Sequence, residues 1–305
     1  MELTALRQFI AMAEAGHMTR AAEAIGVTQP TLSAMLKKLE EEVGSPLLDR
    51  TGRGVRLTDA GRAFLEHAEA SVRSAEQAID AVRELRGLSR GVIRVGGGAT
   101  AVAHLLPAVA GAVRAEHPGL RLVMREAGSS QVASAVLAGE LDLGVVTLPV
   151  DVPGHGDLMT VGEAQDELRL IVPGGHALAG RKAFRWSDLE DEPVVAFEAG
   201  SAVRLVIDRA AAAFGVSLDV VMELRSIESI QKMVEAGIGV GFVSRLALEA
   251  GVGTGAEPGE GLACRDGRLT RQLGVVRRRD RMPSDAAAAF ERALLDRLGS
   301  IAAVD

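Results

Sequence analysis

The sequence is poor in the features that mark secreted and membrane proteins. Its 305 residues include one cysteine, and no apolar run approaches the roughly 20 residues needed to span a bilayer. Cys264 alone cannot form an intramolecular disulfide, which fits a reducing compartment. Glu2 and Glu14 lie in the opening segment, where a signal peptide would be basic. We therefore expect a cytoplasmic protein that does not contact a membrane.

Motifs for catalysis and metal binding are missing as well. The sequence has no G-x-S-x-G element, and its histidines have no histidine or cysteine partners at ligand spacing. The histidines are His17, His67, His104, His117, His155 and His176. We expect no metal, no cofactor and no enzyme activity.

An excess of basic residues, which would favour a nucleic-acid partner, is also lacking, because the net charge is -7. The distribution of charge removes this objection. Residues 1–62 hold eight basic and eight acidic residues, so the whole deficit lies beyond residue 62. A neutral domain binding DNA alone would bind weakly. We therefore expect two such domains at each site, which together gather enough phosphate contacts.

What the sequence does contain is a helical hairpin between Thr19 and Glu40, TRAAEAIGVTQPTLSAMLKKLE. Two short amphipathic helices joined by a tight turn at Gly26 can carry a recognition helix into a DNA groove. Thr28 is placed as the N-cap of the second helix, and Pro30 falls in its first turn. The expected buried residues are Ala21, Ala22 and Ile25 on the first helix and Leu32, Leu36 and Leu39 on the second. Ordinary helical hairpins also have polar outer faces, so further signals are needed.

The outer face of the second helix is suited to DNA. Glutamine pairs with an adenine edge, Thr and Ser donate to bases or phosphates, and lysine neutralises phosphates. The outward residues are Gln29, Thr31, Ser33, Ala34, Lys37 and Lys38. A short Gly-rich turn with Arg50, Arg53 and Arg56 follows, and then a helix capped by Thr58 or Asp59. The pattern predicts a winged helix-turn-helix with its wing tip at Thr51 to Gly54.

Residues 1 to about 90 resemble the DNA-binding domain and linker helix of LysR-type transcriptional regulators. The resemblance extends over about sixty consecutive residues: an opening helix with Leu3, Leu6, Phe9 and Ile10, then TRAAEAIGVTQPTLSAMLKKLEEEVG, then RTGRGVRLTDAG. It implies that the recognition helix lies at the major groove and that Arg53 reaches phosphate or minor groove. The candidate DNA-binding residues are Gln29, Pro30, Thr31, Ser33, Lys37, Arg50 and Arg53.

Two departures from the family pattern leave the base preference open. Family members commonly carry a long polar residue, often arginine, where this chain has Ala34, and a polar residue where it has Met35. A methyl group cannot read guanine, although it can touch a thymine methyl.

From Asp59 to about Gly87 there is no proline and, apart from Gly61, no glycine. Apolar residues recur there at alternating spacings of three and four: Leu65, Ala68, Val72, Ala75, Ile79 and Val82. This stripe predicts a helix of about 29 residues and about 43 Å. An ordinary core helix is the alternative. The length of the predicted helix favours a dimer, because a domain of about sixty residues cannot bury the whole stripe. The resemblance implies antiparallel pairing of two such helices and tetramers built through the effector domains, and RNA polymerase is a candidate partner.

Beyond the hinge GLSRG at Gly87 to Gly91, strands alternate with helices in two series. The predicted fold class is α/β, with an N-terminal all-α winged helix-turn-helix and a bilobed effector-binding domain resembling periplasmic solute-binding proteins. The predicted domains are 1–58 (DNA-binding), 59–87 (dimerisation linker) and 88–305 (effector-binding), with lobe 1 at about 91–162 and 272–305 and lobe 2 at about 167–263. A loop crossing near 162–167 and a return near 263–272 are expected to join the lobes.

A Gly-rich turn opens a helix in each lobe, GGGAT in the first and EAGSA in the second. Helix N-termini favour anions, and open α/β sheets bind ligands at the carboxyl ends of strands. We expect a small carboxylate or similar anion between the lobes, bound by Thr100, Ser129, Thr147, Gly200, Ser201 and Arg204. Each of these is also explained by simple helix capping, and Arg204 can instead pair with a surface acid. Glu198 and Glu228 can also line the cleft.

One motif supports a different class of function. GGGATA directly after a strand fits G-x-G-x-x-A, and Glu126 ends the next strand, as in a dinucleotide site. The acid falls about 30 residues on, whereas the motif expects about 20. The alternative is therefore a dinucleotide-dependent enzyme fused to a helix-turn-helix. The favoured hypothesis is a LysR-type regulator of double-stranded DNA that responds to a small-molecule effector.

Overall fold

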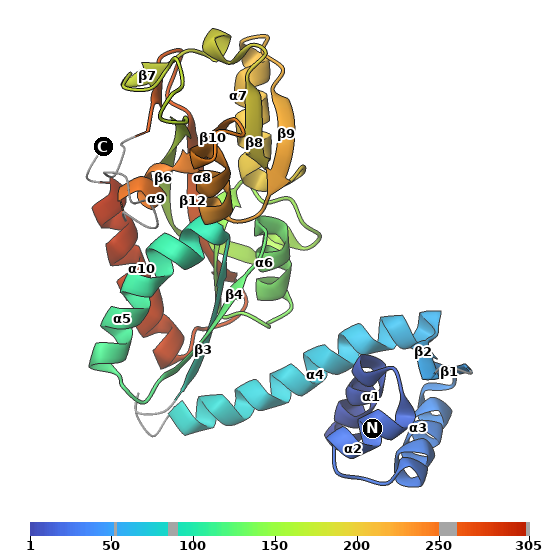
Figure 1. Cartoon of the computed structure of the whole chain (residues 1–305). Helices are drawn as coiled ribbons and strands as arrows, with labels where there is room; N and C mark the ends of the chain where they lie inside the picture. Colours follow the sequence, from blue (N-terminus) through green and yellow to red (C-terminus); the bar gives the residue numbers. More distant parts are fainter. Residues whose placement is uncertain (52–53, 85–90, 250–260, 303–305) are drawn as a thin grey trace. The chain divides into compact units, whose positions relative to one another are not determined.

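The structure is a computed structural model that describes residues 1–51, 54–84, 91–249 and 261–302. The chain divides into two compact units, Met1–Val82 (unit 1) and Arg83–Asp305 (unit 2). Figure 1 labels many of their helices and strands. Among the helices described, none combines the length and the apolar character that crossing a bilayer requires.

Unit 1 is a helical domain with a β-hairpin wing (Figure 1). Its elements are α1 (Leu3–Ala15), α2 (Met18–Ala24), α3 (Gln29–Val43), β1 (Leu48–Thr51), β2 (Gly54–Leu57) and α4 (Asp59–Glu84). Gly26 turns the chain with a left-handed φ of 70°. The Thr28 hydroxyl accepts the N–H of Thr31 at 3.4 Å and caps α3, with Pro30 in the first turn as expected. The predicted leucine stripe of α3 is buried in the core of unit 1.

The apolar stripe of α4 is divided between two environments. Ala68 and Val72 are buried in the core of unit 1, against α1 and its neighbours. Further along the same helix, Ile79 is 50% exposed and Val82 is 63% exposed. The first half of the stripe thus stabilises its own domain, and only the second half presents apolar surface. Residues 85–87 of the predicted helix lie outside the described residues.

Unit 2 contains an eight-stranded sheet among its described residues, in the order β4-β3-β5-β12-β6-β10-β8-β9. The strands are β3 (Val92–Gly97), β4 (Arg121–Glu126), β5 (Leu143–Leu148), β6 (Leu158–Ile171), β8 (Pro193–Phe197), β9 (Asp219–Leu224), β10 (Val240–Ser244) and β12 (Thr270–Arg278). Two short strands, β7 (Ala183–Phe184) and β11 (Ala263–Cys264), pair separately. We call the β4-β3-β5 side lobe 1 and the β10-β8-β9 side lobe 2.

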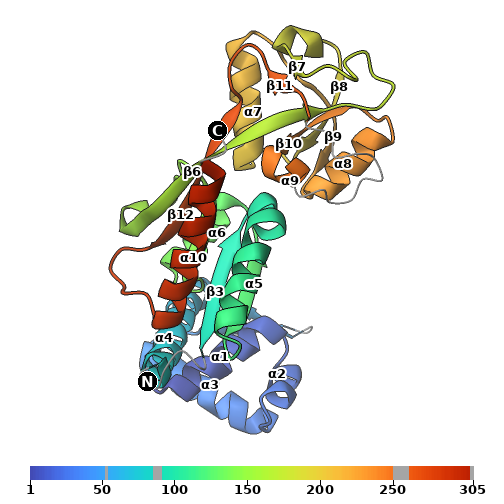
Figure 2. The ribbon, with the colours of Figure 1, turned by 90° about the vertical axis from the view of Figure 1, so that its left-hand side faces the viewer.

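Helices cover both lobes. Lobe 1 carries α5 (Leu106–Glu116), α6 (Ser129–Leu137) and α10 (Asp285–Ala302), and α5 lies beside α10 in Figures 1 and 2. Lobe 2 carries α7 (Ala202–Ala213), α8 (Ile227–Glu235) and α9 (Arg245–Glu249). Each lobe has its own core, one including Phe290 and the other including Trp186. The predicted helix from Thr100 to Glu116 begins as a π-helical turn, Ala101–Leu105, before α5.

The crossing between the lobes is a strand, so the expected loop near 162–167 is wrong. Strand β6 pairs with β12 over residues 158–167 and then with β10 over residues 168–171. Its residues 163–167, EAQDE, are mostly polar, so the sequence there does not have the pattern of a buried strand. Its hydrogen bonds come from β12, which is distant in the chain. The return to lobe 1 is β12, which also pairs with β5.

The strand directions make two carboxyl edges face each other within unit 2. Strands β3, β4 and β5 are parallel, and β5 and β6 are both antiparallel to β12. Strand β10 runs opposite to β6 and parallel to β8, which is parallel to β9. Since β6 runs from lobe 1 into lobe 2, the carboxyl ends of both strand groups are directed towards the crossing. Ligands of open α/β sheets bind at such ends.

Candidate functional site

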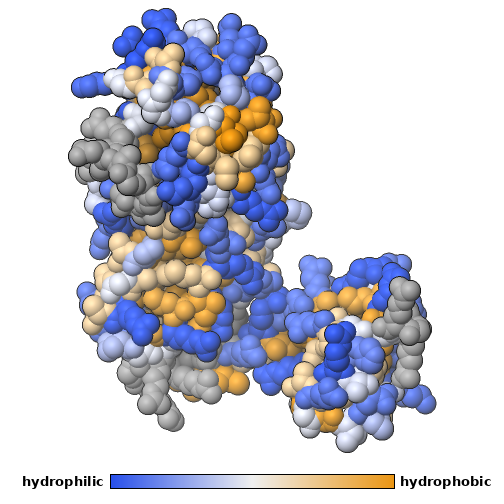
Figure 3. All heavy atoms as spheres, viewed as in Figure 1, coloured by the Kyte–Doolittle hydropathy of each residue, from blue (hydrophilic) through white to orange (hydrophobic). Residues whose placement is uncertain are grey.

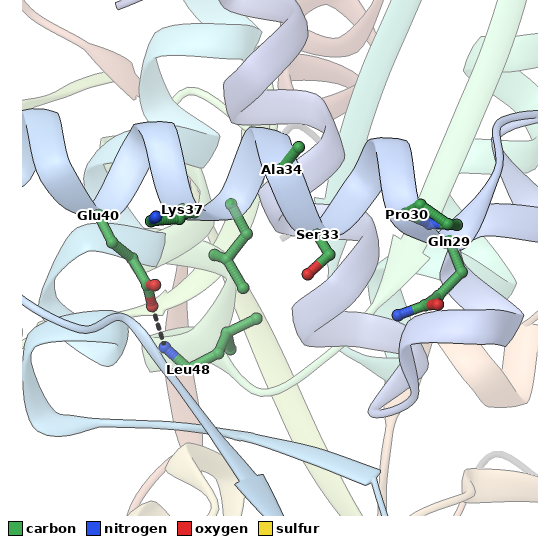
Figure 4. Close-up of a pocket in the computed structure, with 8 residues that line it drawn as sticks. Gln29, Pro30, Ser33, Ala34, Lys37, Glu40 and Leu48 are labelled. Carbon is green, nitrogen blue, oxygen red and sulfur yellow. Dashed lines mark hydrogen bonds between the residues drawn. The ribbon is translucent and has the colours of Figure 1, made fainter.

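The outward face of α3 and the start of the wing enclose a hollow of about 580 Å³ (Figure 4). It is lined by Gln29, Pro30, Ser33, Ala34, Leu36, Lys37, Glu40 and Leu48. In Figure 4, Gln29, Ser33 and Glu40 project from the same side of the helix. The hollow therefore brings together four of the candidate DNA-binding residues, Gln29, Pro30, Ser33 and Lys37.

The candidates on α3 are accessible to a ligand. Gln29, Pro30, Thr31 and Lys37 are exposed, and Ser33 is partly buried. The hydroxyl of Thr31 bonds to that of Thr28 at 2.8 Å, which couples it to the helix cap. An exposed amide beside lysine can pair with base edges and phosphates.

The wing contributes its backbone and one contact that the sequence did not reveal. Strand β1 pairs with β2 with Arg50 opposite Val55, whereas the side chain of Arg50 and the whole of Arg53 lie outside the described residues. At the base of the wing, the carboxylate of Glu40 accepts the N–H groups of Leu47 and Leu48 at 2.8 and 3.2 Å. Its only sequence signal is its place at the end of α3.

The wing leads into α4 through Thr58. Its hydroxyl accepts the N–H of Gly61 at 2.9 Å and donates to the carbonyl of Pro46 at 2.8 Å. Of the two expected caps, Thr58 and Asp59, Thr58 is therefore the one that caps α4.

In unit 2, a buried polar cluster lies where the two carboxyl edges meet. Arg271 Nη2 donates to Thr100 Oγ1 at 2.7 Å, and Arg271 Nε donates to Asp166 Oδ2 at 2.7 Å. The hydroxyl of Ser244 donates to Asp166 Oδ1 at 2.6 Å. We call Thr100, Asp166, Ser244 and Arg271 the junction cluster. It joins lobe 1, both crossing strands and the end of β10.

The junction cluster contains two buried charges of opposite sign, those of Asp166 and Arg271. All four side chains are buried, and Thr100 is 5% exposed. A buried carboxylate and guanidinium are stable together only if their hydrogen bonds are well made, and removing one partner leaves an uncompensated charge. Nearby, burial lowers the pKa of the His104 imidazole, while the charge of Asp166 acts in the opposite direction. His104 Nδ1 is buried without a hydrogen-bond partner among the described residues.

A second contact joins two predicted site residues in lobe 1. The hydroxyl of Ser129, at the start of α6, accepts the N–H of Thr147 at 2.9 Å. Thr147 is buried near the carboxyl end of β5. Ser129 thus links β5 to α6 at the same sheet edge as Thr100.

In lobe 2, Ser201 is an N-cap and Arg204 is held by acids. The Ser201 hydroxyl accepts the N–H of Arg204 at 3.3 Å, directly after Gly200, which has a left-handed φ of 79°. The Arg204 guanidinium donates to Asp208 at 2.8 Å and to Glu223 at 3.1 Å. Burial disfavours its charge, yet these bonds raise the pKa of the guanidinium. Of the two expected roles for Arg204, the structure contains the pairing with acids.

Gly96 and Gly97, the first two glycines of GGGATA, have a packing role. A Cβ at Gly96 would collide with Leu141, and one at Gly97 would collide with Ala101. Close packing therefore explains Gly96 of the G-x-G-x-x-A pattern and its neighbour Gly97, whereas a Cβ at Gly98 would meet no atom within 4 Å.

Three members of the junction cluster were missed from the sequence: Asp166, Ser244 and Arg271. Asp166 and Arg271 are 105 residues apart, so local spacing does not indicate the pair. The available signal was a charged residue in each of two segments that otherwise form strands.

The sequence of this chain matches two family models and is similar to known transcriptional regulators. A family model described as bacterial regulatory helix-turn-helix protein, lysR family, matches residues 3–62. A second model, the LysR substrate binding domain, matches residues 86–299. A probable RuBisCO transcriptional regulator from Synechocystis sp. is 31% identical over 296 residues, covering 96% of this chain and 85% of that protein.

Solved structures have the same fold. Full-length CbnR complexed with its target DNA aligns over 97% of this chain and all of that one, with a TM-score of 0.75 and 24% identity. The regulatory domain of Synechocystis CcmR in complex with 2-PG (2-phosphoglycolate) aligns over 68% of this chain and 98% of that one, with a TM-score of 0.60 and 25% identity. The two family models together span most of the sequence, and the chain therefore belongs to the LysR family of transcriptional regulators.

Proposed function

We propose that this LysR-family regulator reads promoter DNA with the outward face of α3 and the wing, and that a small anion held between the lobes of unit 2 changes this binding. We further propose that the chain is not an enzyme. The observation that carries the effector part is the pair of opposed carboxyl edges in unit 2, where Thr100 and Ser244 meet through Asp166 and Arg271.

The DNA part is supported by the chemistry around the hollow on α3. Gln29 can pair with an adenine edge, and Lys37 can neutralise a phosphate. Pro30 and Ala34 are exposed one helical turn apart and form an apolar strip that fits a thymine methyl. We propose Thr31, Ser33, Arg50 and Arg53 as further DNA contacts.

The effector part is supported by hydroxyl groups on both edges. We propose Thr100, Ser129, Thr147, Gly200 and Ser201 as the effector-binding set, with Arg271 as the positive charge that bonds to Thr100. Arg204 already faces Asp208 and Glu223, so we assign it to holding the start of α7.

The anionic class of the effector is supported by two independent considerations. Helix starts with capping hydroxyls favour negative charge. The related CcmR regulatory domain is bound to 2-PG in its structure. We therefore propose a small organic acid or phosphate ester.

We also propose that the regulator works as a homo-oligomer in the cytoplasm, where its DNA lies. Ile79 and Val82 give α4 an exposed apolar end that a second copy can cover. In unit 2, apolar side chains gather on the visible face of each lobe (Figure 3), and Val123 and Val221 are exposed on the two edge strands. These surfaces suit a dimer through the linker helices and a tetramer through the effector domains, with domain limits near 1–58, 59–87 and 88–305.

The test is footprinting and fluorescence anisotropy of the full-length protein on DNA from its own upstream region. A panel of small acids that includes 2-phosphoglycolate is compared with neutral metabolites. We expect specific binding, and an altered footprint or affinity with an acid. The absence of specific binding would contradict the DNA part, and a response to a neutral metabolite alone would contradict the anionic part. A nicotinamide fluorescence change on titration with NADH would support the dinucleotide alternative.

A further inference from the structure

We infer that Glu40 is a positioning residue of the DNA-binding surface. Its carboxylate holds the first residues of the wing against α3, and its charge weakens binding to DNA of any sequence. Holding the wing raises the preference for the operator over random DNA, while the charge lowers the affinity for both. This inference rests on the proposed DNA-binding function and adds to it a determinant of specificity.

The geometry ties Glu40 to the wing. Its Oε1 atom accepts the N–H of Leu47 at 2.8 Å and that of Leu48 at 3.2 Å, and Figure 4 shows the bond to Leu48 across the hollow. Leu47 and Leu48 are both buried. Removing the carboxylate would therefore leave two backbone donors without this acceptor in a poorly solvated segment.

The same segment is fixed from the other side by the start of α4. The N–H of Thr58 donates to the carbonyl of Leu47 at 3.0 Å, and the Thr58 hydroxyl donates to Pro46. Gly61 packs so closely on the Leu47 carbonyl that no Cβ would fit there. With α4 already anchored to these residues, Glu40 supplies the link from the wing to the recognition helix.

The charge of Glu40 points to a function beyond architecture. The carboxylate lines the hollow that also contains Gln29 and Lys37, where DNA phosphates are expected to approach. A negative charge at that place repels phosphates of every sequence equally, because the backbone carries no sequence information. A neutral acceptor of the same shape would hold the wing without this repulsion.

The chain offers a matched control in Glu41. This neighbour carries the same charge, its side chain is 66% exposed, and it forms an ion pair with Lys37 at 3.8 Å. Glu41→Gln therefore removes one negative charge from the same helix turn without touching the wing.

The experiment compares full-length Glu40→Gln, Glu40→Ala and Glu41→Gln with the wild type. Hydrogen exchange is measured at the Leu47 and Leu48 amides, and affinity is measured on the footprinted operator and on random duplex DNA over a range of salt concentrations. In Glu40→Gln, we expect unchanged protection and about a two- to fivefold gain in affinity on random DNA and on the operator alike. In Glu40→Ala, we expect exchange at both amides to be about tenfold faster or more, with operator binding weakened more than random binding. Glu41→Gln should keep the protection and gain less on random DNA than Glu40→Gln does.

Unchanged exchange at Leu47 and Leu48 in Glu40→Ala would overturn the positioning role. A gain on random DNA no larger in Glu40→Gln than in Glu41→Gln would overturn the role of the charge. If the wild type bound no DNA at all, the proposed function would fail together with the specificity claim, while the exchange measurement would still decide whether Glu40 holds the wing.

Discussion

The two units of this regulator present their site residues in opposite ways. In unit 1, the candidate side chains on α3 stand on one helical face and are mostly exposed, so each can meet DNA without rearrangement of the core. In unit 2, Thr100 and Thr147 are buried and bonded to residues from other elements. A surface that reads DNA can be carried by one helix, whereas a site that couples two lobes is assembled from strands far apart in the chain. Substitutions should therefore act locally in unit 1 and collectively in unit 2.

The largest effect is expected from Arg271→Met, which breaks the junction cluster. The change leaves Asp166 buried without its guanidinium and should destabilise unit 2 by about 3 to 5 kcal/mol. Hydrogen exchange resolved by region should show faster opening in unit 2 and unchanged protection in unit 1. Adding Asp166→Asn removes the orphaned charge and should recover part of the loss. An equal increase of hydrogen exchange in both units would contradict the claim that the substitution acts within unit 2.

The next effect concerns α4, whose two halves differ in the same way. Ile79→Glu charges the exposed half and should leave a folded monomer that binds a two-half-site operator about a hundredfold more weakly. Analytical ultracentrifugation measures the change in mass, with Ile79→Leu as the control. Val72→Glu, by contrast, puts a charge into the core of unit 1 and should unfold that unit. An unchanged mass for Ile79→Glu would show that the dimer is held elsewhere.

A smaller and more selective effect is expected from Gln29→Ala. The variant should lose about 1 to 3 kcal/mol on the operator and relax specificity at one base pair, because the amide reads a base edge. Lys37→Ala is the comparison, since it should weaken all sequences alike and reduce the salt slope by about one. Binding across single-base operator variants separates the two patterns. Equal loss on operator and random DNA for Gln29→Ala would exclude it from base readout.

The smallest effect concerns Ala34. Each operator thymine is replaced in turn by deoxyuridine, which lacks only the methyl group. We expect one position to lose about twofold to fivefold in affinity, because burying one methyl group contributes roughly 0.8 kcal/mol to the free energy of binding. The loss should largely disappear in Ala34→Gly, where the protein methyl is also gone. A methyl effect that is the same in both proteins would place the contact elsewhere, for example at Pro30.

The two units also differ in how much of their structure could be predicted from the sequence. In unit 1, Thr28, Pro30 and the leucine stripe of α3 are local signals, and the structure has the cap, the turn and the buried face that they predict. The register of α4 was also predictable, but the burial of Val72 within its own unit was not, because it depends on packing against other helices.

In unit 2, the alternation of strands and helices was predictable, whereas the junction was not. The pairing of β6 with β12 brings the polar run 163–167 into a strand, and it brings Asp166 to Arg271 across 105 residues. No spacing rule reaches that far, because tertiary pairing supplies both the hydrogen bonds and the charge partner. The helix start at Ser201 was visible in the sequence, and its cap bond from the N–H of Arg204 is local, whereas the bond from the N–H of Thr147 to Ser129 depended on the fold.

The central claim is that unit 1 binds the operator and unit 2 binds the effector. The most direct test is calorimetry on the full-length variants Thr100→Val, Ser201→Ala and Gln29→Ala, with an identified effector and with the operator. We predict that Thr100→Val lowers effector affinity by about 1 to 3 kcal/mol through an unpaired polar partner, and that it leaves operator affinity without effector unchanged. Gln29→Ala should show the reverse pattern. If Thr100→Val and Ser201→Ala both retained full effector affinity, the effector would bind outside the junction of the lobes and the account would be contradicted.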